Sequence, residues 1–288
     1  MNRMFDRVVS VTVSKPISAT EFFRTLDVTT ITAHRVRFRI EKKIEQDPNT
    51  CEITISNLSE QTRAEFQTKP LQVRIDAGFD GNLQSLFVGD LIWGSSKREG
   101  TDWELKLQLG DGVRAIRDGR TSLTFGSGVN AKTVLGHLAG TMGLKLPKNI
   151  ADAKELTAQF QTGVTVHGPS RDQMSKLLRP HKMDWSIQDG RLQILRDGEA
   201  VAVEALLWNQ STGMIGSPEF GPPEDEPGKK PKPPTLTSKS LLRPDVSPGR
   251  PIVVQSAAIE GLFRVERVTH TGDTHGVDWF TEIEATPQ

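Results

Sequence analysis

The first third of the chain is dominated by short segments in which apolar and polar residues alternate. In segment 34–40 every second residue is apolar and arginines stand between them: Val36, Phe38 and Ile40 against Arg35, Arg37 and Arg39. Segment 103–109 repeats the pattern with Trp103 and three leucines. A period of two places alternate side chains on opposite faces of a β-strand, and no helical face accommodates it. Both segments are therefore predicted strands, with Trp103 in the core and the arginines outside.

Further signals between residues 53 and 112 predict the order strand, helix and three paired strands. Apolar runs at 53–58, 73–79 and 86–93 predict strands, and Ser59 followed by Glu60 predicts a capped helix that continues through Phe66. The polar stretch between residues 93 and 103 is short, which predicts an antiparallel hairpin. Residues 1–118 are therefore predicted to form a first β-domain.

After residue 119 the apolar positions change to helical spacing. A helix is predicted over 130–142, with Asn130 as its cap, Gly143 as its end, and four residues on its buried face: Val134, Leu135, Leu138 and Met142. Ser170–Gln173 has the form of a capping box. It predicts a second helix that ends before Pro180 and buries three residues: Met174, Leu177 and Leu178.

Two alternating runs that meet at Asp189-Gly190 predict a β-hairpin. Met183, Trp185 and Ile187 form the apolar side of the first run, so Trp185 is expected in a core. Residues 119–199 are predicted to be a small α+β unit of two helices and a hairpin.

The last part of the chain returns to strand character. Strands are predicted at 251–254, 262–265 and 279–283, separated by turn-rich runs that include 271–276. Residues 217–235 contain seven prolines and two opposite charge clusters, Glu224–Glu226 and Lys229–Lys230. Such a composition buries little apolar area, which predicts an extended or disordered loop. A second β-domain over 200–288 that carries this loop is expected.

Charge and cysteine content exclude several classes of function. The 36 basic and 36 acidic side chains cancel, so the long-range field that supports non-specific nucleic-acid binding is absent. Cys51 is the one cysteine, which excludes a disulfide framework and a thiolate zinc cage. Met1–Arg7 carries charge where a signal peptide needs an apolar run, and no stretch is long enough to span a bilayer. We expect a soluble protein made in a cytoplasm, without stable membrane insertion.

The sharpest enzymatic candidate is Gly126–Thr133, which follows a short predicted strand and opens a helix. A phosphate-binding loop needs a glycine directly before its lysine, because the backbone N–H groups must wrap the phosphates. Ala131 occupies that position before Lys132. No later apolar strand ending in Asp is present to hold magnesium, so a glycine turn followed by a capped helix is the favoured interpretation.

Metal and nucleophile signals are weaker. His270, Asp273, His275 and Asp278 carry metal-compatible atoms, but the glycines among them favour a hairpin turn. No serine or cysteine has the spacing of a nucleophile elbow. A glycosidase pair among the many carboxylates needs a cleft that the sequence does not indicate. The arginine stripe of segment 34–40 is a candidate DNA contact, for which a solvated strand face or a subunit contact is the simpler explanation. We predict no catalytic, cofactor-binding or metal-binding residues.

The order of these elements resembles baseplate hub and late-control proteins of contractile or long-tailed phages. The resemblance covers nearly the whole chain, although each segment is a loose pattern. Its N-terminal segments are Ile55–Ser59, Ala77–Phe79, Leu86–Gly89 and Gly110–Gly112. Its C-terminal segments are Thr212–Pro218, Leu242–Pro244, Ser247–Gly249, Val265–His270, Gly272–Asp273 and Trp279–Thr281.

The resemblance implies a mainly β fold, with two tail-tube-like antiparallel β-barrel domains, 1–118 and 200–288, on either side of the insertion 119–199. It implies a structural protein and no enzyme: a homotrimer whose six barrels match a six-fold tail tube to a three-fold spike and leave a channel for phage DNA, without sequence-specific binding. The implied partners are the tail tube protein, the spike or tail-tip protein and other baseplate proteins. The implied location is the virion baseplate, after assembly in the cytoplasm of the host bacterium.

Two other classes remain open. One is a tail-associated enzyme, either a peptidoglycan hydrolase or a nucleotide-binding protein built on the helical insertion. The other is a carbohydrate-binding module of the tail tip, in which an exposed aromatic residue such as Trp93 stacks on sugars.

Overall fold

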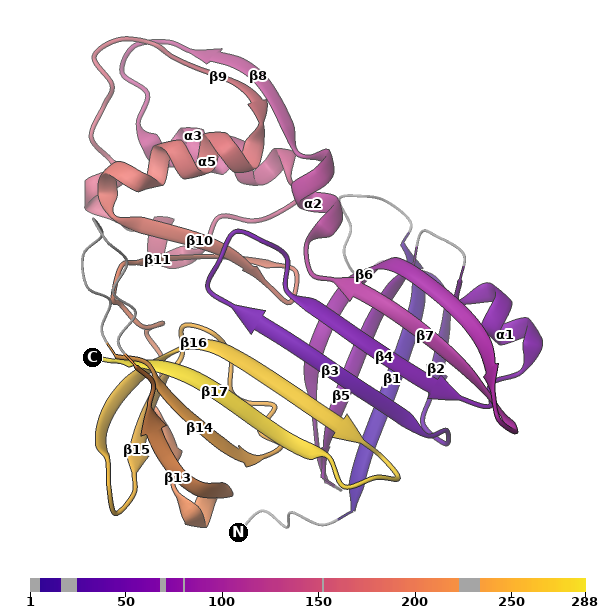
Figure 1. The fold of residues 1–288 in the computed structure, drawn as a ribbon. Coiled ribbons are helices and arrows are strands. Elements are labelled where there is room, and N and C mark those ends of the chain that lie inside the picture. The colour runs from indigo at the N-terminus through magenta and orange to yellow at the C-terminus, as the bar shows by residue number, and fades with distance from the viewer. Residues whose placement is uncertain (1–5, 17–24, 68–70, 80, 152, 223–233) are drawn as a thin grey trace.

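The computed structural model describes residues 6–16, 25–67, 71–79, 81–151, 153–222 and 234–288, and Figure 1 shows its fold. The strands are β1 Arg7–Pro16, β2 Thr25–Ile31, β3 Val36–Lys43, β4 Thr50–Ser56, β5 Gln72–Phe79, β6 Asn82–Glu99, β7 Asp102–Gly110, β8 Arg120–Phe125, β9 Val164–Pro169, β10 Met183–Gln188, β11 Arg191–Arg196, β12 Leu206–Trp208, β13 Met214–Phe220, β14 Leu236–Leu241, β15 Pro251–Gln255, β16 Glu260–Asp273 and β17 Trp279–Pro287. The helices are α1 Glu60–Glu65, α2 Val113–Asp118, α3 Ala131–Thr141, α4 Lys148–Ala151 and α5 Ser170–Leu178, with 3-10 turns η1 Lys154–Leu156, η2 Arg179–His181 and η3 Gln210–Thr212.

One large sheet connects the two ends of the chain. Eleven of its 13 strands follow the order β13-β14-β17-β16-β3-β4-β7-β6-β5-β1-β2. The other two form a branch, in which β15 pairs with β16 and β12 pairs with β15. The central joint is the antiparallel pair β16 and β3, in which His270 lies opposite Ile40. Figure 1 shows β3, β4 and β7 in front of β1 and β5, so the N-terminal part of the sheet curls around a core.

The buried side of this sheet follows the alternation in the sequence. Val36, Phe38 and Ile40 are buried in a cluster with apolar residues of β1, β4, β5, β6 and β7. The predicted helix is α1, whose N-cap Ser59 accepts a hydrogen bond from the Thr62 N–H group. The order strand, helix and three paired strands is thus confirmed in β4, α1, β5, β6 and β7.

A second cluster fills the region between residues 115 and 194, on the upper side of Figure 1. Helix α3 begins after Asn130, whose side chain accepts from the Thr133 N–H group, as the sequence predicts. Hairpin β10–β11 turns at Asp189-Gly190, again as predicted, and Trp185 is buried beneath α5 with 1% of its surface exposed. The region also contains the antiparallel pair β8–β9.

The third cluster lies among β12 to β17. The predicted C-terminal strands are present as β15, β16 and β17, but β16 extends from Glu260 to Asp273 and is much longer than the predicted run. Ser217–Phe220 belong to strand β13, where Glu219 pairs with Thr237, so the proline-rich loop was predicted to start too early. Residues 223–233, with both charge clusters of that loop, lie outside the described residues.

Four further predictions differ from the structure. Two closed barrels are not confirmed: the described strands of the two β regions form one open sheet, because β16 pairs with β3 and joins these regions. Trp103 is 40% exposed, since it lies at the end of β7 beyond the core. The antiparallel hairpin predicted here is confirmed as β6–β7, but most of the polar stretch 94–101 is strand and not turn, because β6 continues to Glu99. Ser170 does not cap α5: Pro169 is the N-cap, and the Ser170 hydroxyl contacts that of Thr141 at 2.7 Å.

No helix within the described ranges is long and apolar enough to cross a bilayer.

Candidate functional surface

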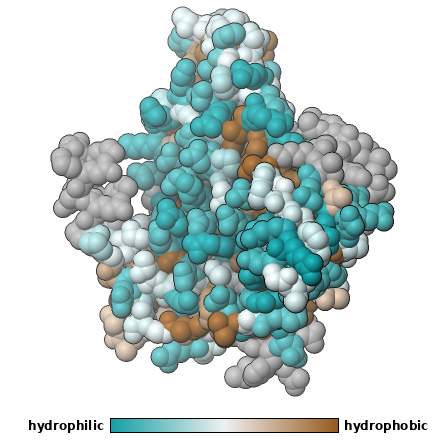
Figure 2. Space-filling model, turned by 45° about the vertical axis from the view of Figure 1, so that its right-hand side comes forward, coloured by the Kyte–Doolittle hydropathy of each residue, from teal (hydrophilic) through white to brown (hydrophobic). Residues whose placement is uncertain are grey.

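The side of the sheet turned away from the cores is a polar surface that crosses the joint between the two β regions. We call it the outer sheet face and define it by the outward residues of β14, β17, β16, β3, β4 and β7. Its charged members are Lys239, Glu282, Glu284, Arg267, Arg37, Arg39, Glu41, Glu52, Glu104 and Lys106. Figure 2 shows mainly hydrophilic residues over this side of the molecule, with scattered apolar patches.

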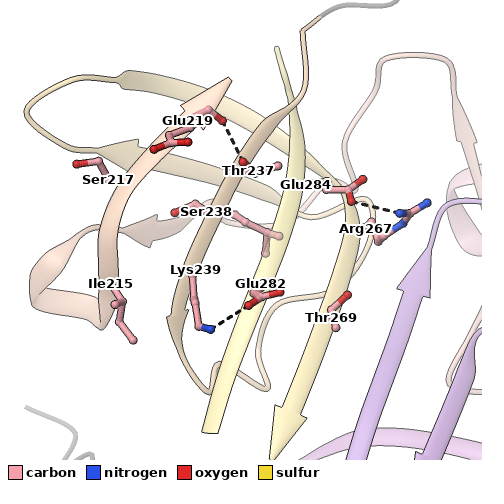
Figure 3. A pocket seen from close by; sticks show the side chains of 11 residues that line it. Ile215, Ser217, Glu219, Thr237, Ser238, Lys239, Arg267, Thr269, Glu282 and Glu284 are labelled. Carbon is pink, nitrogen blue, oxygen red and sulfur yellow. Dashed lines mark hydrogen bonds and ion pairs between the residues drawn. The ribbon is translucent and has the colours of Figure 1, made fainter. Parts of the chain in front are cut away.

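Opposite charges on this face form ion pairs, two of them across neighbouring strands. Lys239 Nζ lies 3.0 Å from Glu282 Oε1, and Arg267 Nη1 lies 3.2 Å from Glu284 Oε1 (Figure 3). The further pairs are Arg37 with Glu104 and Arg39 with Glu41. Exposed pairs of this type contribute little to stability, about 0–1 kcal/mol each. Their consequence is electrostatic: the face compensates its own charges and offers no continuous basic track.

A shallow groove of about 290 Å³ lies on this face between β13, β14, β17 and β16. Figure 3 shows that its lining is mostly polar, with Ile215 at one end and Thr269 near the joint. Its two basic groups, Lys239 and Arg267, are both engaged with glutamates. The groove also contains three glutamates, Glu219, Glu282 and Glu284, and the last two are the partners of these basic groups.

The two ends of the sheet are open strand edges. β2 pairs with β1 only, and β13 pairs with β14 only, among the strands that the structure describes. The pairing of β13 is interrupted by a register shift between Ile215 and Glu219. Ile215 and Phe220 expose 42% and 46% of their surface at this edge. An open edge with exposed apolar residues is the usual place for another strand to add.

The structure supports the helix-cap interpretation of Gly126–Thr133. The Gly128 N–H group donates to the Phe160 carbonyl oxygen at 2.9 Å, and the Thr133 N–H group donates to Asn130 Oδ1 at 2.9 Å. Two of the backbone donors that a phosphate-binding loop would use are thus already engaged inside the protein.

We expect Lys132→Ala and Thr133→Ala to change the free energy of unfolding by less than about 0.5 kcal/mol, as is usual for substitutions at a partly exposed helix start. Neither variant should differ from the parent protein in a nucleotide titration followed by calorimetry. ATP binding that Lys132→Ala abolishes would contradict the helix-cap interpretation.

Near residue 273, the side chains of His270 and Asp273 make hydrogen bonds within the protein. His270 is buried, its Nδ1 contacts Thr281 Oγ1 at 2.9 Å, and burial lowers its pKa to about 3. Asp273 accepts from Arg35 Nη2 at 2.6 Å and from the His275 N–H group at 2.9 Å. The Arg35 hydrogen bond is the main reason that the pKa of Asp273 falls to about 2. No group of three or more metal-compatible side chains occurs within the described residues.

The remaining candidates are dispersed. Arg35 forms an ion pair with Asp273 at the end of β16, whereas Arg37 and Arg39 form ion pairs on the outer sheet face. Trp93 is 49% exposed on β6, away from the groove in Figure 3. Cys51 is buried, and burial raises its thiol pKa, which favours the neutral thiol. Sequence reasoning missed the joint β16–β3, because no local signal marks which strands pair.

Comparison with known proteins identifies the fold. No protein-family profile matches the chain, and no curated protein matches it. Among solved structures, the 43 kDa tail protein of prophage MuSo2 from Shewanella oneidensis matches with a TM-score of 0.62 and 7% identity over 96% of both chains. The tail protein from Neisseria meningitidis MC58 matches with a TM-score of 0.61 and 13% identity over 97% of both chains.

A third match is the E. coli c3393 protein, a component of the type VI secretion system with structural similarity to T4 bacteriophage tail proteins gp27 and gp5. Its TM-score is 0.60 at 10% identity, over 88% of this chain and 73% of that one. The resemblance found in the sequence is thus confirmed as a shared fold: the chain has the fold of phage tail proteins and of a type VI secretion component.

Proposed function

We propose that the chain is a structural baseplate hub protein of a phage tail or a related injection device. It acts as a trimeric ring that adapts a six-fold tail tube to a three-fold spike and leaves a channel for DNA. The observation that carries the proposal is the continuous sheet, which joins two β regions in one chain and leaves β2 and β13 as open edges at the ends of its main strand order. The shared fold with tail proteins supports it.

The open edges suggest how a ring closes. Contact between β2 of one copy and β13 of the next covers both edges, and repeated head-to-tail contact forms a ring when the rotation closes. Three copies then place six β regions around one axis. A permanent contact of this kind buries on the order of 2,000 Å² or more. The domain limits at 118/119 and 199/200 belong to this proposal. The three apolar clusters support them in large part, although Leu242 and Trp279 of the C-terminal region lie in the first cluster.

The outer sheet face is our candidate for the lining of the channel. Most of its charges are paired within the face, so a polyanion has few free cations to bind. Tight binding of DNA depends on lysines and arginines that neutralise phosphates. A hydrated face whose opposite charges neutralise one another allows DNA to pass without sequence-specific binding. The tube protein, the spike or tail-tip protein and other baseplate proteins are the partners in this proposal, which places the chain in the virion after assembly in the host cytoplasm.

Ile215→Glu tests the ring. A carboxylate at the β13 edge opposes burial in a subunit contact, whereas Lys239, its register partner, accommodates the charge within one chain. We expect the dissociation constant of the trimer to rise roughly tenfold or more, which corresponds to about 1.4 kcal/mol. Sedimentation velocity measures this, with and without the tube and spike proteins.

Val277→Glu is the matched control, because Val277 is 80% exposed in the turn between β16 and β17 and should leave the trimer intact. A parent protein that stays monomeric with and without its partners, or forms a two-fold dimer with a closed centre, would exclude the hub. A trimeric ring that clears a peptidoglycan suspension would retain the architecture and assign the chain to the wall hydrolases.

A further inference from the structure

The insertion is held against the first β region by the tip of its hairpin. Hairpin β10–β11 packs in the second cluster, and that cluster is separate from the cluster of the large sheet. Figure 1 shows the hairpin lying across the end of the sheet. The turn residues Asp189 and Gly190 enter a polar socket, which we define as Lys42, Asn49, Val88 and Asp111.

Two carboxylates and one lysine form the centre of the socket. Asp111 Oδ2 and Oδ1 accept from the N–H groups of Asp189 and Gly190, at 2.5 and 2.9 Å. The Asp189 carboxylate accepts from Lys42 Nζ at 2.7 and 2.8 Å, and its Oδ1 also accepts from the Val88 N–H group at 3.3 Å. The turn is thus held from both sides by charged groups.

Asn49 forms hydrogen bonds with the strand that leads into the turn. Its Nδ2 group donates to the Ile187 carbonyl oxygen and to Gln188 Oε1, each at 2.9 Å. Gln188 Nε2 in turn donates to the Lys43 carbonyl oxygen at 2.8 Å. Ile187 supplies a tight apolar contact, since a Cβ at Gly112 would lie 2.5 Å from its Cδ1 atom.

The socket is buried but its charges do not cancel. Asp111 and Lys42 expose 0% and 3% of their surface. Burial and the neighbouring charge of Asp189 raise the pKa of Asp111 to about 7, although Lys42 and the two N–H donors oppose the shift. The other charges near this end of β7 are Asp90 of β6 and Arg114 of α2, which form an ion pair with each other at 2.6 Å.

We propose that the hairpin tip is a releasable, proton-sensitive latch, which holds the insertion to the sheet more tightly when Asp111 is protonated. Release at the tip leaves other contacts of the insertion in place, among them Ser175 with Gln46 and Gln193 with Pro248. The latch therefore controls how firmly the hairpin is docked and not whether the insertion stays attached.

The direction of the pH dependence follows from the two states of Asp111. In the docked state its pKa is about 7, and when the tip is released it returns toward the ordinary value of 3.8. Between these two values the docked state binds more protons, so docking is strongest at acid pH and weakens as pH rises through 7. From pH 6 to pH 8 the docking equilibrium should fall about tenfold.

Amide hydrogen exchange at Gly190 and Asp189 measures the latch directly, because these N–H groups donate to Asp111. After correction for the intrinsic exchange rate, we expect their protection factors to fall about tenfold between pH 6 and pH 8. In Asp111→Asn the fall should disappear. Glu52→Gln, on the exposed side of the same β region, is the control and should keep the parent profile.

Lys42→Met gives a second, independent readout if Asp111→Asn folds poorly. Removing the lysine leaves the two carboxylates without their counter-charge, so the fall in protection should move to higher pH. Protection at Gly190 equal to that at Ile53 in the sheet core, at both pH values, would show that the tip opens only on global unfolding and would overturn the proposal. A pH profile that both variants share with the parent would also overturn the proposal.

Discussion

Trp185→Ala should lower the free energy of unfolding by about 3–5 kcal/mol. The indole is almost fully buried in the cluster of the insertion, among residues of α3, α5 and the hairpin. Its Nε1–H group donates to Ser175 Oγ at 3.0 Å, so the substitution removes a large apolar volume and a buried hydrogen bond together. Thermal and denaturant unfolding measure the loss.

The loss should be concentrated in the insertion. Its apolar cluster is separate from that of the large sheet, so amides of β10 and α5 should exchange faster in Trp185→Ala while those of β4 change much less. Leu123→Ala is a control in the same region, because Leu123 is 40% exposed and should have a small effect. A melting curve unchanged by Trp185→Ala would contradict the assigned burial.

Local periodicity predicted most of the individual elements, because burial on one face leaves a mark at short range. β3 is an example: its alternation of apolar residues with arginines is the burial pattern itself. Helix α3 is another, since Asn130 both starts the apolar period and caps the first turn. Turn Asp189-Gly190 was equally predictable, because Asp189 and Gly190 both have positive φ, at 51° and 75°.

Long-range pairing was not predictable in the same way. Arg35 and Asp273 are 238 positions apart, and nothing local to either residue indicates the other. The pairing of β16 with β3 and the socket around Asp111 also join segments far apart in the sequence, so no local pattern predicted them. Trp103 was misjudged because alternation gives the face of a strand but not where the core ends along it. The indole is 40% exposed and is covered on one side by the Arg63 guanidinium, 4.2 Å from the ring centroid.

Trp279→Ala should cost about 3–5 kcal/mol and weaken the connection between the two β regions. Trp279 begins β17 in the C-terminal region, yet its side chain is buried in the cluster of the first β region. Its ring centroid lies 5.7 Å from that of Phe38 and 6.5 Å from that of Phe79, both in edge-on geometry. Amide exchange should therefore rise in β3 and β17 together, and a change confined to β17 would contradict this connection.

Phenylalanine at the two tryptophan positions separates the packing from the polar contribution. Trp279 Nε1 is buried and has no hydrogen-bond partner among the residues that the structure describes, whereas Trp185 Nε1 donates to Ser175. An unsatisfied buried donor carries a desolvation cost of about 1–3 kcal/mol, which Trp279→Phe removes. Trp185→Phe instead leaves the Ser175 hydroxyl without its donor. We expect Trp279→Phe to be the less destabilising of the two in denaturant unfolding, and the reverse order would show that the Trp279 indole N–H group is satisfied.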